Sequence, residues 1–423
     1  MTAARGSGYD LFGNRLFRNL WGANLIHGLG LVMLLLGASW VMTSLTDNPL
    51  LVSMVQTMMS LPFLFFSIPA GVAADTFGHR TVLLFAQAWM LVMTGVLAVV
   101  ALPGWWDLRP IPLLAVLFLI GSGVVVAQSA WKPFLHDLVP GDKLVAAISL
   151  NSLSNRIAQL LGPVLGGYLM GLAGIAVLLF TRAVSHLVMI AALLRIPKSP
   201  SGIADSIPSG TDSPRNLRAQ VGGSVRDGWR AVTGSPQLYG PLLRCVALMV
   251  PVGAVLALLP LEAKENIQTG VIGYGGLLFA LGLGTTLGVV SVPVLQRRLR
   301  LNALSVVCIV VFALAVLGIS QWDSMLLDAI FLLFLGLAWS ILSTSHQIAV
   351  QIASPPAARG LTTSFYGMAL QGSIAVGSFV FGLLSRYVGV SPSILVAGLL
   401  ALTGLLLVRR YPLPDPAADG SAA

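Results

Sequence analysis

Apolar residues gather in long runs along most of this chain, and short polar segments separate the runs. A helix of about 20 mostly apolar residues crosses the roughly 30 Å apolar layer of a bilayer. Twelve runs reach this length: 19–45, 49–73, 81–102, 112–135, 144–171, 174–196, 238–261, 271–294, 302–320, 325–353, 361–385 and 390–408. The pattern predicts an all-α membrane protein with twelve transmembrane helices.

The composition explains why the bilayer must be the solvent. The 423 residues are 56% hydrophobic and only 9% charged, whereas soluble domains average about 25% charged residues. The net charge of +9 would favour a nucleic-acid partner in a soluble protein. Here the basic residues stand in short loops between apolar runs, so we expect a lipid bilayer around the chain and no nucleic-acid partner.

The positions of the basic residues predict the orientation. Cytoplasmic loops carry an excess of Lys and Arg. With the N-terminus inside, 18 of the 24 basic residues fall on the cytoplasmic side, and three (Arg109, Lys264 and Arg386) fall outside. The first apolar run is longer than the roughly 7–15 residues of a signal-peptide core. We therefore expect an uncleaved first span and cytoplasmic N- and C-termini in the bacterial inner membrane.

The longest polar segment, 197–237, divides the apolar runs into two groups of six. Its first part is rich in Ser, Pro, Gly and Asp, which is typical of a flexible linker. We expect an N-terminal six-helix bundle at 1–196, a C-terminal bundle at 238–410 and a disordered cytoplasmic tail at 411–423.

A shift of 215 residues aligns the two groups. It places Gly121 on Gly336, Pro140 on Pro355, Gly162 on Gly377 and Gly167 on Gly382. Parallel six-helix repeats are a known transporter plan. The alignment favours a duplicated six-helix unit.

The loop after the second run reads Gly71-Val-Ala-Ala-Asp75-Thr-Phe-Gly78-His-Arg80. We expect Gly71 to permit close helix packing, and Asp75 to cap a neighbouring helix or to pair with a base across the two halves. The loop resembles the signature loop of the major facilitator superfamily, which often has Arg where His79 stands. The resemblance implies a cytoplasmic latch formed by Gly71, Asp75, Gly78 and Arg80. An ordinary turn is the alternative.

A Gly-Pro pair lies in the fifth run. Gly162 and Pro163 precede Gly166 and Gly167. Small residues let helices approach closely, and proline bends a helix. The pair resembles the Gly-Pro motif of exporters in the superfamily, which implies a conformational role for Gly162, Pro163 and Gly167. Plain helix packing is the alternative.

Three further segments, 137–152, 273–284 and 359–366, are similar to the transmembrane secretion effector group, which includes enterobactin exporters and macrolide efflux proteins. The resemblance covers about 12–410 and implies proton-driven export of a small organic solute by alternating access. Many members have Asn and Arg where this chain has Arg156 and Gln159, which leaves the substrate open. We expect a monomer without a cofactor.

Three basic side chains fall within predicted helices, and no acid lies at mid-membrane. A charge there costs about 2.5–3.5 kcal/mol on insertion scales and marks a functional site by default. Arg156 and Arg182 contact an anionic solute in one interpretation and neighbouring backbones in the other. We expect Arg244, nearer a helix end, to extend its side chain toward the interface. Glu262, Glu265, Asp323 and Asp328 cluster at the predicted outer side.

Candidate proton-coupling residues are His27, His186 and His346, because histidine titrates near neutral pH. The candidate solute-binding residues are Arg182, Arg156, Asn24, His27, Gln128, Gln347, Gln371 and Trp339. The two cysteines, Cys245 and Cys308, lie in apolar runs and suit neither a disulfide framework nor a metal site.

Three other functions stay open at this point. The same fold serves importers and lipid transporters, and a transport-inactive sensor or assembly scaffold would have the same composition. A membrane enzyme usually has His, Asp or Cys residues clustered at one membrane face. The sequence of this chain shows no clear cluster of that kind, so an enzyme is disfavoured. We therefore expect a small-molecule substrate, protons as the coupling ion and no catalytic site.

Overall fold

The structure is a computed structural model, and it describes residues 11–101, 108–196, 230, 234–319, 321–354 and 359–413. This part of the chain is helical and contains no strand. The first group of helices is α2 (Arg15–Leu45), α3 (Pro49–Phe77), α4 (His79–Val100), α5 (Pro110–Leu138), η1 (Gly141–Lys143) and α6 (Leu144–Arg195). The second is α8 (Pro236–Leu261), η3 (Glu262–Asn266), α9 (Val271–Arg298), α10 (Leu301–Ile319), α11 (Met325–Ala353), α12 (Arg359–Val388), α13 (Val390–Ala401) and α14 (Gly404–Arg410).

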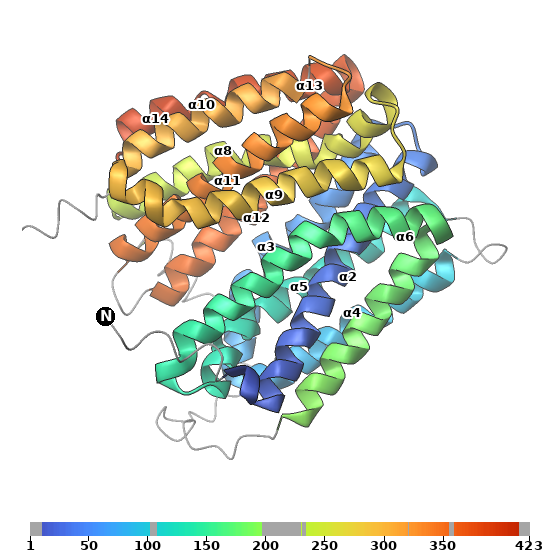
Figure 1. Ribbon diagram of the computed structural model, residues 1–423, viewed down its shortest axis with the longest axis vertical. Helices are drawn as coiled ribbons and strands as arrows, with labels where there is room; N and C mark the ends of the chain where they lie inside the picture. The colour runs from blue at the N-terminus through green and yellow to red at the C-terminus, as the bar shows by residue number, and fades with distance from the viewer. Residues whose placement is uncertain are drawn as a thin grey trace, which may run out of the picture.

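Eleven helical segments in the described residues are long and apolar enough to cross a membrane. One of them contains α6, whose 52 residues are interrupted at Gly174, with φ 69° and ψ −168°. A positive φ of this size favours glycine. The chain reverses direction there (Figure 1), so α6 contains the fifth and sixth predicted spans. The predicted all-helical membrane fold is confirmed.

The helices form two bundles that lie side by side (Figure 1). Helices α2–α6 make the first half, and α8–α14 make the second. Side chains on the outside of the bundles, such as Phe65, Leu172, Phe180 and Leu406, are more than half exposed. Large apolar surfaces of this kind suit a lipid environment. Most of the predicted linker, 197–229 and 231–233, lies outside the described residues.

The two ends of the molecule differ. We call the end where α2 begins and α14 ends the terminal end, and the end that holds Gly174 and Gly389 the far end. At the far end the halves touch closely. A Cβ on Gly275 of α9 would lie 2.6 Å from the Pro163 carbonyl oxygen of α6, and one on Gly167 would lie 2.9 Å from the Val271 carbonyl oxygen.

A cleft separates the halves at the terminal end. It has a volume of about 1140 Å³ and is lined by Gly71, Asp75 and His136 from the first half and by Ile352 and Thr363 from the second, among others. The molecule is therefore closed between the halves at the far end and open at the terminal end.

The C-terminal segment differs from the expectation at its start. Leu413 is 3% exposed, and its backbone N–H donates to Asn302 Oδ1 at 2.9 Å. Arg244 is also buried. Its Nη1 donates to Asn302 Oδ1 at 3.1 Å and to the Tyr411 carbonyl at 3.3 Å. Arg244 is thus buried, and its side chain reaches the start of α10 and the residues after α14 at the terminal end, where residues 411–413 pack against the second half. Residues 414–423 lie outside the described part.

Candidate functional site

A cavity of about 340 Å³ lies inside the first half and is bounded by α2, α4, α5 and α6. Its wall includes apolar side chains such as Leu31, Val124 and Met189. The polar part of its wall is made by Asn24, His27, Gln87, Gln128, Lys132, Asn151, Asn155 and Gln159. Gln128 and Lys132 also line the cleft between the halves, so the cavity and the cleft adjoin.

Asn24 organises one side of this cavity. Its Nδ2 donates to Ser154 Oγ at 2.7 Å, to Asn151 Oδ1 at 3.1 Å and to Asn155 Oδ1 at 3.4 Å. Trp131 Nε1 also donates to Asn151 Oδ1, at 2.8 Å. A connected polar network of this kind rigidifies its members. It presents amide groups and an aromatic ring to the cavity in fixed positions.

Arg182 lies behind the wall of the cavity and is 0% exposed. Its Nη1 donates to the His27 carbonyl at 2.9 Å and lies 3.4 Å from His27 Nδ1. Its Nη2 lies 3.7 Å from Met90 Sδ, and its Nε has no hydrogen-bond partner in the described part of the chain. A buried charge persists only when nearby dipoles offset its desolvation. The guanidinium therefore depends on the His27 carbonyl, which belongs to a cavity-lining residue.

The two histidines of the first half lie next to each other. The His27 and His186 rings pack edge to face with centroids 5.3 Å apart. His186 is 0% exposed, and its Nδ1 lies 2.7 Å from Gln87 Oε1. His27 and Gln87 line the cavity, whereas Arg182 and His186 form a layer behind them. The structure thus brings together four residues from α2, α4 and α6 that are distant in the sequence: His27, Gln87, Arg182 and His186.

The remaining predicted residues lie elsewhere. Arg156 is half-buried on α6, and its Nη1 donates to Gln159 Oε1 at 3.3 Å. His346 is 1% exposed, and neither ring nitrogen has a hydrogen-bond partner among the residues described. Gln347, Gln371 and Trp339 are half-buried in the second half, away from the wall of the cavity.

Lys132 is a site residue that the sequence reasoning counted only as one of the basic residues on the cytoplasmic side. It lies in α5 and borders both the cavity and the cleft. Residues four apart share one face of a helix, so its spacing from Gln128 was a signal that could have found it. Asn151 was noted only as part of a family resemblance, although it accepts hydrogen bonds from Asn24 and Trp131.

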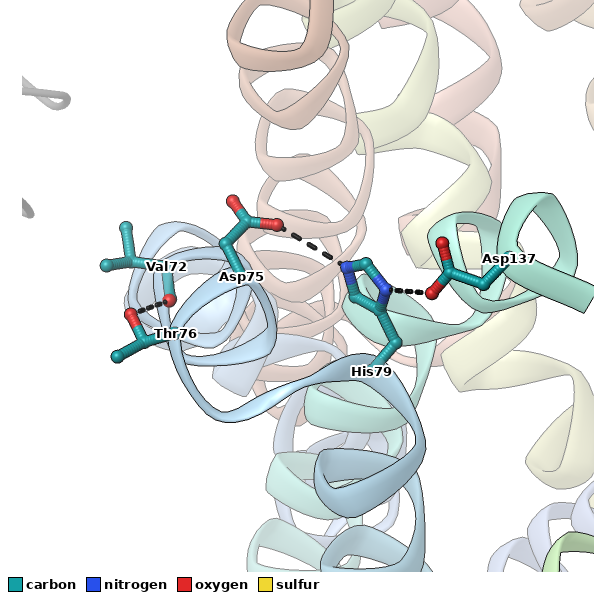
Figure 2. A network of polar contacts seen from close by, with 5 residues as sticks. All are labelled: Val72, Asp75, Thr76, His79 and Asp137. Carbon is teal, nitrogen blue, oxygen red and sulfur yellow. Dashed lines mark hydrogen bonds and ion pairs between the residues drawn. The ribbon is translucent and has the colours of Figure 1, made fainter. Parts of the chain in front are cut away.

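The signature loop forms a network within the first half (Figure 2). His79 Nδ1 lies 2.6 Å from Asp137 Oδ2, and His79 Nε2 lies 3.6 Å from Asp75 Oδ1. Gly78 has φ 84°, which favours glycine at this helix junction. Among the described residues, Asp75 therefore pairs within its own half, and His79 joins the end of α5 to the loop.

Arg80 and Gly71 have different surroundings. Arg80 Nε donates to the Leu193 carbonyl at 3.0 Å and its Nη2 to the Leu194 carbonyl at 3.3 Å. A cation that binds the last carbonyls of a helix also complements the helix dipole. A Cβ on Gly71 would meet no atom of the described residues within 4 Å. The close packing expected at Gly71 is therefore absent in this conformation.

The Gly-Pro motif packs α6 on two sides. A Cβ on Gly162 would lie 2.8 Å from Val32 of α2, and the Pro163 carbonyl faces Gly275 of α9. This one segment of α6 thus contacts both the cavity-lining helix α2 and, across the two halves, helix α9. A movement of α6 would change both.

Comparisons with known proteins agree with this geometry. The family model described as "Transmembrane secretion effector" matches residues 6–423. The enterobactin exporter EntS of Citrobacter koseri is 26% identical over 365 residues, which are 83% of this chain and 82% of that protein. An MFS-type transporter of Bacillus subtilis, YfiS, is 24% identical over 385 residues, 86% of this chain and 87% of its own.

Solved structures share the fold at low sequence identity. The nucleoside transporter NupG has a TM-score of 0.72 at 13% identity, over 94% of this chain and 100% of its own. A bacterial homolog of the human lysosomal transporter Spinster, in an inward-facing and unoccupied conformation, has a TM-score of 0.71 at 13% identity, over 94% of this chain and 97% of its own. The chain is a multi-pass membrane transporter, not an enzyme, and it belongs to the transmembrane secretion effector family of the major facilitator superfamily.

Proposed function

We propose that this transporter exports a small organic solute across the bacterial inner membrane by alternating access, as a monomer driven by protons. One observation carries the proposal. The polar cavity of the first half adjoins a cleft that is open at the terminal end, while the halves are closed at the far end. This is the arrangement that a carrier needs to load solute from one side only.

The charge distribution supports cytoplasmic loading. With both termini in the cytoplasm, the positive-inside pattern is obeyed by 18 basic residues against three. The cleft then opens toward the cytoplasm, where an exporter collects its solute. Export is also the activity named for the enterobactin exporters that this chain resembles.

The wall of the cavity favours an anionic, partly aromatic solute. Among the described residues, its lining includes the ammonium of Lys132, the His27 ring and several amides, but no carboxylate. Arg182 adds a second positive charge directly behind His27. Trp131 offers an aromatic surface, and cavities with mixed apolar and polar walls suit organic ligands. Phenolate and carboxylate oxygens would meet donors on several sides.

In the proposed cycle, the signature loop and the Gly-Pro motif change their contacts with the second half as the two halves move. In this conformation the His79 network stays within the first half and leaves the cleft open. When the terminal end closes, the loop approaches the second half, and Gly71 receives a neighbour. At the far end, Gly167 and Gly275 separate as the halves rock.

The test uses purified protein and membrane vesicles. A thermal-shift panel of catecholate siderophores, hydroxamate siderophores and macrolides should identify one class that stabilises the protein. Gln128→Leu should abolish the shift, and Gln347→Leu, outside the cavity, should keep it. The same compound should accumulate in everted vesicles when a pH gradient is imposed, and a protonophore should stop it. Accumulation only in right-side-out vesicles would show import and refute the proposed direction.

A further inference from the structure

Two acidic side chains are buried at the far end of the second half. Glu262 is 1% exposed, and Asp328 is 0% exposed. Glu262 begins η3, a single π-helical turn, and such turns are rare and frequent at functional sites. Asp328 lies in the first turn of α11. Acidic side chains are almost never fully buried unless they are paired, so the surroundings of these two carboxyls matter.

The two carboxyls have few partners. Glu262 Oε2 accepts hydrogen bonds from Asn266 Nδ2 at 2.7 Å and from Ser391 Oγ at 3.5 Å. Both carboxyl oxygens of Asp328 are buried without a hydrogen-bond partner among the described residues. Within the same residues, the ion pairs involve only His79, so neither acid has a basic partner. A buried carboxylate without a partner is strongly disfavoured, whereas a neutral carboxylic acid fits such a place.

The charged groups around the pair are mainly acidic. Glu262 acts electrostatically on Asp328, so the two carboxyls form a pair, and Asp323, before α11, acts on both. Glu265 of η3 acts on the buried glutamate, and Asp47, between α2 and α3, acts on Glu265. Lys264, also in η3, donates its Nζ to the Thr43 carbonyl of α2, in the other half. The acidic neighbours disfavour a second negative charge at the pair.

We propose that Asp328 and Glu262 form a proton-binding site whose occupancy favours closure of the far end. The inference rests on the alternation between two conformations in the proposed function. The turn η3 contains both Glu262 and Lys264. The hydrogen bond from Lys264 to the Thr43 carbonyl links the two halves at this end. With the far end closed, the buried pair holds a proton from the outer water. When the far end opens, water reaches the pair, and the proton returns to that side as the carboxylate forms.

This coupling makes the conformational equilibrium depend on pH in a defined direction. The closed far end binds more protons than the open one, so acid on the outer side increases the population of the conformation described above. Each proton that is bound in only one conformation changes the ratio of the two about tenfold per pH unit, between the pKa values of the two states. Acid would thus favour the return of an empty exporter to its cytoplasm-open conformation.

The experiment measures the width of the terminal cleft in the full-length protein. Ile148 and Ile352 face the cleft from opposite halves, and both are nearly half exposed. Each is replaced by cysteine and spin-labelled, while the native Cys245 and Cys308 are buried. Pulsed electron paramagnetic resonance then gives the fraction with a wide cleft at pH values from about 5 to about 8, a series wide enough to show a tenfold change per pH unit.

The expected results separate the buried pair from its neighbour. In the parent, the ratio of wide to narrow clefts rises by up to about tenfold for each pH unit of acidification. Asp328→Asn, which mimics the protonated acid, holds the cleft wide at every pH. Glu262→Gln flattens the pH dependence. The matched control Glu265→Gln, an exposed acid of the same turn, keeps the steepness of the parent's pH dependence and moves its midpoint to lower pH, because one acidic neighbour of Glu262 is removed.

Two results would overturn the proton site. One is an Asp328→Asn protein with the parent's pH dependence. The other is a parent whose ratio changes at fixed pH when choline replaces sodium, which would assign the site to a metal cation. If Asp328→Asn does not fold, dicyclohexylcarbodiimide tests the parent, because it modifies protonated carboxyls in apolar surroundings. Mass spectrometry should find the adduct on Asp328 or Glu262, decreasing at alkaline pH, and a missing adduct refutes the proposal.

The outcomes also distinguish this inference from the proposed function. Solute transport that persists without pH-dependent change at the pair refutes only the proton site. A single cleft width at every pH and in every variant, without solute movement, refutes the alternation and the proton site together.

Discussion

Adding one methyl group at Gly275 should shift this transporter toward its other conformation. The Cβ of Gly275→Ala would lie 2.6 Å from the Pro163 carbonyl oxygen and 3.3 Å from the Gly167 Cα. Both atoms are backbone atoms of α6, which cannot rotate away as a side chain would. The methyl group therefore fits only if α6 and α9 separate, and that separation opens the far end.

The size of the effect follows from the contact. Overpacking by one methylene in a well-packed interface typically costs about 1–3 kcal/mol. The same methyl costs little once the halves have separated, so the whole penalty falls on the conformation with a closed far end. A difference of about 1–3 kcal/mol changes the ratio of two states by about 5- to 150-fold.

Gly276→Ala is the matched control on the same helix. Its Cβ would meet only the Met325 Cε atom, at 3.3 Å, which is the far end of a flexible side chain. Both variants gain about 1 kcal/mol of helix propensity relative to glycine, so propensity cancels in the comparison. Only Gly275→Ala should narrow the terminal cleft.

Spin labels at Ile148 and Ile352 provide the assay, since these residues line the cleft from opposite halves. We expect a shorter label-to-label distance to become dominant in Gly275→Ala, with the parent's distances in Gly276→Ala. Equal distance distributions in both variants would refute the reasoning, because the close approach of α6 and α9 would then not control the conformation.

Three other changes test separate parts of the molecule. Arg182→Gln should lower the affinity for an anionic solute by about tenfold, which is about 1.4 kcal/mol. The melting temperature should stay equal or rise, because a buried charge is removed. Titration calorimetry and thermal melting of the same sample measure the two quantities. Arg182→Lys should restore only part of the affinity, because Lys lacks the planar fork of Arg. Asp75→Asn and Asp137→Asn should each impair transport in vesicles at normal protein abundance. Reporter fusions after Pro200 and Leu413 should be active only with a cytoplasmic reporter.

Each of these has an outcome that would contradict it. If Arg182→Gln lowers melting temperature and abundance together at unchanged affinity, the residue is structural. Transport that is as fast in Asp137→Asn as in the control Asp142→Asn, an exposed acid of η1, would make the His79 network a plain turn. A periplasmic reporter signal at either fusion point would reverse the predicted topology.

The helices of this protein could be predicted from its sequence almost completely. The predicted run 325–353 has the same bounds as α11, Met325–Ala353. The predicted run 49–73 begins at the same residue as α3, Pro49–Phe77, and ends four residues earlier. In a bilayer each span must satisfy its own backbone hydrogen bonds, so a long apolar run has no competing structure. The kind of element and its length follow directly from the run.

The rotation of each helix was beyond the sequence. Arg156 and Arg182 were both candidate solute-binding residues, yet Arg182 is buried behind the cavity and Arg156 is half-buried beside Gln159. Lipid tails are as apolar as a protein core, so the apolar pattern of a membrane helix does not tell which face points inward. The packing of α6 against α2 and α4 decided that Arg182 meets His27.

Contacts between distant residues were decided only by the tertiary structure. The sequence identified the signature loop, but the acceptor of His79 is Asp137, 58 residues away, at the end of another helix. It also placed Glu262 and Asp328 at the outer side, where solvated acids are expected, and the structure buries both. The sequence by itself determined which segments cross the membrane, because that depends on local hydrophobicity. Packing determined which polar groups lose water, because burial depends on neighbours brought from other helices.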